Sequence, residues 1–122
     1  AVAVALVLVG AARSVLGRLL DAADPATVDR ARTLAARTPG VLGVDELRLR
    51  WSGHGQWAEL TVIVDRNLSL VCAHEIAHDV EHHLMHGLPR LVRAHVHPDP
   101  APVLGVDDHA SVAHHTRPAQ TV

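Results

Sequence analysis

The stretch VLGVDELRLRWSGHGQWAELTVIVD, residues 41–65, decides the fold because apolar and polar residues alternate along two segments of it. The apolar side of the first segment is Leu47, Leu49 and Trp51, and that of the second is Ala58, Leu60, Val62 and Val64. Alternation of this period is typical of half-buried β-strands. Because residues 52–55 between the segments have the composition of a tight turn, the stretch predicts a β-hairpin.

A helix is predicted on each side of this hairpin. Asp24 is a good N-cap and Pro25 suits a first helical position, so the first helix is expected to begin there and to end at Pro39-Gly40. Its predicted apolar face is Val28, Ala31, Leu34 and Ala35. The second helix covers residues 70–88, and its predicted buried stripe is Leu70, Ala73, Ala77, Val80, Leu84 and Leu88.

The stretch RLVRAHVHPDP, residues 90–100, predicts a last strand. Its expected inward side is Val92, Ala94 and Val96, and its outward side is Arg93, His95 and His97. The order helix, hairpin, helix, strand predicts an α+β sandwich of the ferredoxin-like (metallochaperone-like) α-β-β-α-β kind, in which the helices cover one face of a small sheet. In this arrangement the first and last strands are expected to be near neighbours.

The amino-terminal residues differ from the rest. Residues 1–12 form an apolar run without charge, which Arg13 and Arg18 follow. The run is too short to span a bilayer, which takes about 20 apolar residues, but it suits the end of a longer membrane helix whose cytoplasmic side the arginines mark. A buried helix and a signal peptide are the second and third interpretations. The first interpretation divides the chain into a membrane helix end with a linker (1–23), a folded domain (24–100) and a flexible, His-containing tail (101–122).

Composition limits the possible functions. The chain has 122 residues, enough for one small domain, and it contains no Lys. A net charge of −2 without a basic patch argues against a nucleic-acid partner. Cys72 is the sole cysteine, which excludes an internal disulfide and favours a reducing compartment. The eleven histidines are the feature that a function has to explain.

The segment HEIAH, residues 74–78, matches the His-Glu-x-x-His signature of zinc proteases. His74 and His78 are four residues apart on a helix and can share a zinc ion, with Glu75 as the general base. The metzincin extension is excluded, since Glu81 and Leu84 replace its glycine and histidine. A third ligand on the same helix would require a bend, so a small zinc metalloprotease is a minor alternative.

A second set of candidate ligands lies at the end of the last strand. His97 and Asp99 are two residues apart, so their side chains are expected to project to the same side. Imidazole and carboxylate groups suit Zn²⁺, but they need one or two further ligands. Asp45 on the first strand and His95 on the same face are candidates. The spacing alone is equally compatible with a solvated His and an Asp in a turn.

Three stretches of the hairpin, the second helix and the last strand together resemble a known family. TPGVLGVDELRLRWSG, LSLVCAHEIAHDVEHHL and LPRLVRAHVHPDP, in this order and spacing, are similar to the cytoplasmic carboxy-terminal domain of cation diffusion facilitators, which export zinc, iron or manganese. The resemblance extends from the first residue to about Pro100, because GAARSVLGRLLDAADP is similar to the end of the family's last transmembrane helix and its linker. Asp21 is similar to an acid of the family's charge interlock between the linker and the membrane domain.

The resemblance implies a domain that forms a homodimer on the cytoplasmic side of the cell membrane and binds Zn²⁺, or another divalent transition metal, at the dimer interface. It implies metal ligands at His74, His97 and Asp99. Asp45 lies where members often have a histidine, and it is implied as a weaker ligand for zinc. Thr61 replaces another histidine and is a poor ligand.

We therefore expect the regulatory and dimerising domain of a divalent-cation efflux transporter, without enzyme activity. The membrane-embedded ligands that carry ions in this family are absent from the sequence. The alternatives are the zinc metalloprotease and a dimerisation module that is indifferent to metal. The other histidines are expected to be solvated more often than metal-bound; these are His78, His82, His83, His86, His109, His114 and His115.

Overall fold

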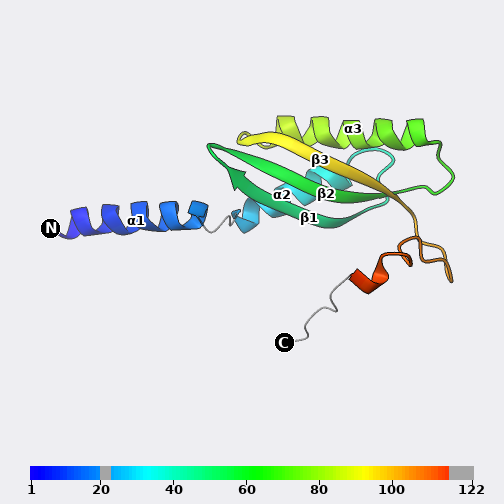
Figure 1. Ribbon diagram of the computed structural model, residues 1–122. Coiled ribbons are helices and arrows are strands. Elements are labelled where there is room, and N and C mark those ends of the chain that lie inside the picture. The colour runs from blue at the N-terminus through cyan, green and yellow to red at the C-terminus, as the bar shows by residue number, and fades with distance from the viewer. Residues whose placement is uncertain (20–22, 116–122) are drawn as a thin grey trace.

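The computed structural model of the chain describes residues 1–19 and 23–115 (Figure 1). From α2 to β3 its elements follow the predicted α-β-β-α-β order, and the predicted apolar helix precedes them. The elements are α1 (Val2–Leu19), α2 (Pro25–Ala36), β1 (Gly43–Ser52), β2 (Gly55–Val64), α3 (Leu70–Gly87), β3 (Leu91–Pro100) and a short 3₁₀ helix (Ala113–His115).

The three strands form one sheet in the order β1-β2-β3. β1 and β2 pair antiparallel as the predicted hairpin, with Ser52 opposite Gly55 at the turn. β3 pairs parallel with β2, because α3 carries the chain back to the end of the sheet where β2 begins. The prediction that the first and last strands are near neighbours is therefore wrong. β1 and β3 form opposite edges of the sheet, roughly 10 Å apart across β2.

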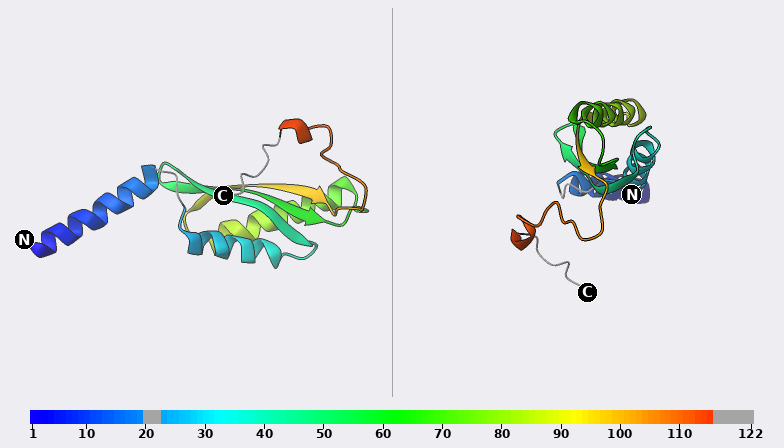
Figure 2. Two further views of the ribbon diagram at one scale, coloured as in Figure 1. Left: turned by 90° about the horizontal axis from the view of Figure 1, so that it is seen from below. Right: turned by 90° about the vertical axis from the view of Figure 1, so that its right-hand side faces the viewer.

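Helices α2 and α3 cover one face of this sheet and leave the other face uncovered (Figure 2). Small and branched apolar side chains fill the layer between helices and sheet, since the chain has no Phe and no Tyr. The predicted inward positions of α2 and of the hairpin belong to the core or pack against it, except Trp51, which is half-buried and lies outside the core cluster. The buried cluster is Ala31, Ala35, Leu49, Ala58, Leu60, Val62, Val64, Val80, Leu84, Leu88, Leu91 and Ala94.

Two positions that were predicted to be buried are exposed. Leu70 is 84% exposed because it is the first residue of α3, and helical side chains point back toward the amino end, here off the end of the helix. Val92 is 57% exposed. The β2–β3 register shifts between Gln56 and Trp57, and this irregularity turns Leu91 inward in place of Val92.

Local contacts fix the ends of the two covering helices. Ser69 is the N-cap of α3, and its side chain accepts a hydrogen bond of 3.2 Å from the backbone N–H of Cys72. Gly40 follows α2 with a φ of 88°, a conformation that a side chain disfavours. The buried Thr38 lies at the end of α2, and its Oγ1 is 2.9 Å from Nδ1 of His83 on α3.

Helix α1 extends away from the end of the sheet and does not cover either of its faces (Figure 1). Its apolar side chains are largely exposed, including Val2 (76%), Leu6 (69%) and Val7 (71%). Within the described residues, no helix has both the length and the apolar character needed to cross a membrane. The assignment of residues 1–23 to a membrane helix end therefore stays a prediction, and Asp21 lies outside the described residues.

Replacing Leu84 with Ala tests the core. Leu84 is fully buried, so its truncation should lower the free energy of unfolding by about 2–5 kcal/mol, since both transfer free energy and packing are lost. Leu70→Ala is the matched control on the same helix, and we expect a change within about 0.5 kcal/mol because Leu70 is exposed. Urea unfolding followed by circular dichroism measures both values. Equal losses would contradict the described packing of α3.

Candidate metal centre

Strand β3 brings His97 and Asp99 into contact. Nε2 of His97 lies 3.0 Å from Oδ1 of Asp99, as the two-residue spacing predicted. The His97 side chain is 62% exposed, whereas that of Asp99 is only 17% exposed. On β2, Thr61 is the register partner of His97. The imidazole nitrogen of His97 and the carboxylate oxygen of Asp99 are thus close enough to be neighbouring ligands of one metal ion.

The uncovered face of the sheet is polar where His97 lies. A hollow of about 200 Å³ is lined by residues of all three strands. Charged residues of this face form ion pairs: Nη2 of Arg50 on β1 is 2.8 Å from Oε1 of Glu59 on β2, and Arg48 pairs with Glu46 within β1. The hollow is lined by Glu46, Arg48, Glu59, Leu60, Thr61, His95 and His97.

His74 lies in a different hollow, between α3 and the edge strand β3. This space of about 110 Å³ is also lined by His78, Glu81 and His95. The His74 and His78 rings are 4.7 Å apart and nearly perpendicular, and Nδ1 of His78 is 3.7 Å from Oε2 of Glu81. His74 and His95 therefore line the same hollow.

Asp45 lies on β1, at the opposite edge of the sheet from β3. It is exposed and falls where the β1–β2 register shifts, between Val44 and Leu47. Its backbone carbonyl accepts a hydrogen bond of 3.3 Å from Arg32. The expectation that strand order would bring Asp45 beside His97 is wrong, because β2 occupies the position between them.

The donor set fits a zinc ion only in part. An imidazole and a carboxylate are suitable ligands for Zn²⁺, which commonly takes four. Among residues 1–19 and 23–115, no three or more His, Cys, Asp or Glu are grouped so that they could hold one metal ion. The pair of His97 and Asp99 is thus half of a possible site, and the same finding leaves the HEIAH segment without a third ligand in this part of the chain.

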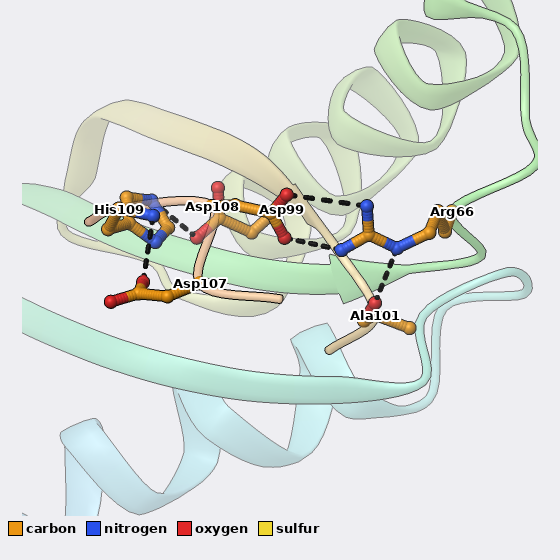
Figure 3. Close-up of polar contacts among 6 residues, drawn as sticks. All are labelled: Arg66, Asp99, Ala101, Asp107, Asp108 and His109. Atoms are coloured by element: carbon orange, nitrogen blue, oxygen red, sulfur yellow. Dashed lines mark hydrogen bonds and ion pairs between the residues drawn. The ribbon is translucent and has the colours of Figure 1, made fainter. Parts of the chain in front are cut away.

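The segment after β3 folds back onto Asp99, a contact that the sequence analysis missed (Figure 3). Arg66, in the loop after β2, holds this segment at two points. Its Nε donates to the carbonyl of Ala101 at 3.1 Å, and its two terminal nitrogens bind the two carboxylate oxygens of Asp108. Nε2 of His109 then lies 3.5 Å from Oδ2 of Asp99.

The hydrogen bond from Arg66 lowers the pKa of the Asp108 carboxyl below its usual 3.8. The positive charge of Arg66 acts in the same direction. This segment has no periodicity from which its fold can be predicted. The acidic pair Asp107-Asp108 beside His109, together with a lone Arg directly after β2, is the signal that was available.

Known proteins are similar to this chain in architecture and in sequence. Residues 23–101 match the family described as cation efflux protein, cytoplasmic domain. The chain belongs to the cation efflux family. Members of this family and their cytoplasmic domains are not enzymes, so the prediction of no enzyme activity is confirmed and the protease alternative is rejected.

Two cation efflux relatives are much longer than this chain. The chain is 48% identical over 99 residues to the probable cation efflux system protein MT2084 of Mycobacterium tuberculosis, covering 81% of this chain and 30% of that protein. It is 35% identical over 72 residues to the cation-efflux pump FieF of Yersinia pestis, covering 59% of this chain and 24% of that pump. The chain thus spans less than a third of the length of either relative.

Solved structures of the MamM CTD confirm the α+β, ferredoxin-like fold. One histidine-to-alanine variant is 30% identical with a TM-score of 0.63, covering 66% of this chain and 100% of that one. A cadmium form of another variant is 33% identical with a TM-score of 0.62, covering 64% of this chain and 98% of that one. A nickel form and a copper form of two further variants are each 32% identical to this chain, with TM-scores of 0.62 and 0.61.

Replacing Arg66 with Gln should raise the pKa of Asp108 toward 3.8, because the hydrogen bond that lowers it is lost. Because the pKa of Asp108 is lowered, its contact with Arg66 stabilises the docked segment fully at pH values above the ordinary carboxyl pKa. This contribution is lost as the pH falls through the lowered pKa. A carboxyl ¹³C NMR titration measures the shift. Arg48→Gln, which alters an exposed arginine of β1, is the control and should leave Asp108 unchanged. An unshifted Asp108 in Arg66→Gln would refute the contact.

Proposed function

We propose that this chain is the regulatory and dimerising part of a divalent-cation efflux transporter, and that Zn²⁺ binds between two copies of the domain. The observation that carries the proposal is the contact between His97 and Asp99, whose donor atoms are 3.0 Å apart. An imidazole nitrogen beside a carboxylate oxygen is a donor pair that zinc accepts.

Two copies of the domain solve the shortage of ligands. A two-fold dimer repeats every surface, so a pair of donors in one protomer is matched by the same pair in its partner. His97 and Asp99 from both copies would supply four donors, the usual number for zinc. His74 and Asp45 are the further ligands that we propose, and movement or the second copy has to bring them closer.

The ion itself is argued from donor chemistry and from relatives. Three different variants of the MamM CTD have been obtained with a metal, one in a cadmium form, one in a nickel form and one in a copper form. Imidazole nitrogen and carboxylate oxygen donors also suit zinc, whose filled d shell imposes no geometric preference of its own.

Metal binding would act on the arrangement of the two copies. An ion that is held between protomers stabilises whichever dimer arrangement brings its ligands together, and the shift is limited by its different affinity for the two arrangements. We place the chain at the cell membrane, with the sheet domain on the cytoplasmic side and α1 leading into the membrane part. The exposed apolar side chains of α1 support this, since soluble surfaces rarely leave such patches uncovered.

The double variant His97→Ala/Asp99→Asn tests the metal site. We expect its affinity for Zn²⁺ to fall by at least about 100-fold, because even the loss of groups that only support ligands lowers metal affinity by about 10–100-fold. Isothermal titration calorimetry of the full chain measures it. His54→Ala removes an exposed histidine of the hairpin turn and should bind as the wild type does. Wild-type affinity in the double variant would refute the assignment.

Sedimentation of the full chain in a mild detergent tests the dimer. We expect a dimer whose sedimentation coefficient or thermal stability changes as Zn²⁺ is added, because metal favours one arrangement. A dimer that does not respond to zinc would favour the metal-independent dimerisation module. A monomer at all zinc concentrations would contradict both.

A further inference from the structure

We propose that His109 is a third metal ligand of this chain, beside His97 and Asp99, and that Arg66 is the residue that positions it. The inference rests on the proposed function, since it assumes that His97 and Asp99 bind a divalent transition ion. It goes further because residues 102–115 lie beyond the part of the chain that matches the family. The site would therefore be a feature of this chain rather than of the shared domain.

Asp99 carries the argument because both of its oxygens face an imidazole. Nε2 of His97 is 3.0 Å from Oδ1, and Nε2 of His109 is 3.5 Å from Oδ2. Ligands that share a tetrahedral zinc at ~2.0–2.1 Å lie about 3.4 Å from one another. Each contact is close to that separation, so each imidazole already lies at ligand spacing from one oxygen of Asp99.

Movement is available to both histidines. Their side chains are each 62% exposed, whereas Asp99 between them is 17% exposed. The two imidazoles contact different oxygens of Asp99. Among the described residues, the three side chains are therefore not arranged around a common metal position. Rotation about the side-chain bonds of His97 and His109 would bring both nitrogens to an ion that Asp99 holds.

Hydrogen bonds hold the backbone on both sides of the turn that precedes His109. Arg66 binds the Ala101 carbonyl through Nε and the Asp108 carboxylate through both terminal nitrogens, so it fixes the chain at these two residues (Figure 3). The N–H of His109 donates to Oδ1 of Asp107 at 2.9 Å, which orients the residue. A paired arginine–carboxylate contact of this kind fixes direction as well as distance. Because Arg66 touches none of the three donors, its role is to position His109.

Zinc affinity of the full chain tests the proposal. His109→Ala should weaken binding of Zn²⁺ by about 10-fold or more, at least the effect seen when a supporting group of a metal site is lost. His54→Ala is the matched control, an exposed histidine at the other end of the sheet, and should not differ from the wild type. Unchanged affinity in His109→Ala would overturn the inference. Increased affinity would also overturn it, because His109 would then merely cover Asp99.

Cobalt separates a ligand from a positioning residue. At saturating Co²⁺ the visible absorption spectrum depends on the donors around the ion, so His109→Ala should change it. Arg66→Gln should lower the affinity but keep the wild-type spectrum at saturation, because His109 is still present. Wild-type affinity in Arg66→Gln would overturn the positioning role, and a wild-type spectrum in His109→Ala would overturn the ligand.

Failure of the proposed function gives a different result. If the wild type takes up no zinc, or if His97→Ala/Asp99→Asn binds as tightly as the wild type, the shared site is wrong and the inference falls with it. If these two results are as expected and His109→Ala alone is indistinguishable from the wild type, only the inference fails.

Discussion

The parallel pairing of β3 with β2 is the constraint on which the rest of the structure depends. It sets Thr61 beside His97 and makes β3 an edge strand, next to which α3 packs. It also brings the end of β3 to the end of β2, where the loop with Arg66 begins. Without this pairing neither the contact of His97 with Asp99 nor the fold-back of the following segment would lie where it does.

The sequence predicts the elements well because burial on one side leaves a clear period in it. The hairpin follows from alternation, as predicted. Asp24 and Pro25 occupy the predicted N-cap and first helical positions of α2, although the Asp24 side chain makes no capping hydrogen bond. Strand order is not encoded in that way. Alternation says which side of a strand is buried but not which strand is its neighbour, so the separation of Asp45 from His97 could not be seen in advance.

The small errors have the same origin in packing. Val92 fits the alternating pattern, yet an irregularity in β3 reverses its direction. Leu70 fits the helical stripe, yet it is the first residue of α3 and its side chain points off the end of the helix. Both depend on where the regular part of an element begins, which local periodicity does not record.

The two halves of the candidate site differ in how far they could be predicted. His97 and Asp99 belong to one strand, so a spacing of two residues is enough to bring them together. The contacts of Arg66 with Asp108 and of His109 with Asp99 join residues 42 and 10 positions apart through a chain reversal. Such a reversal is set by turns near Val103 and Val106 that have no repeating pattern.

The uncovered face of the sheet has a further consequence. Its side chains include Arg48, Arg50 and Glu59 rather than an apolar layer, and the pairs among them are exposed. Any surface that approaches this face meets fixed charges of both signs, and attraction between such charges is screened beyond about 10 Å at 0.1 M ionic strength. The affinity of any association through this face would therefore depend on salt concentration more than that of an association through an apolar interface.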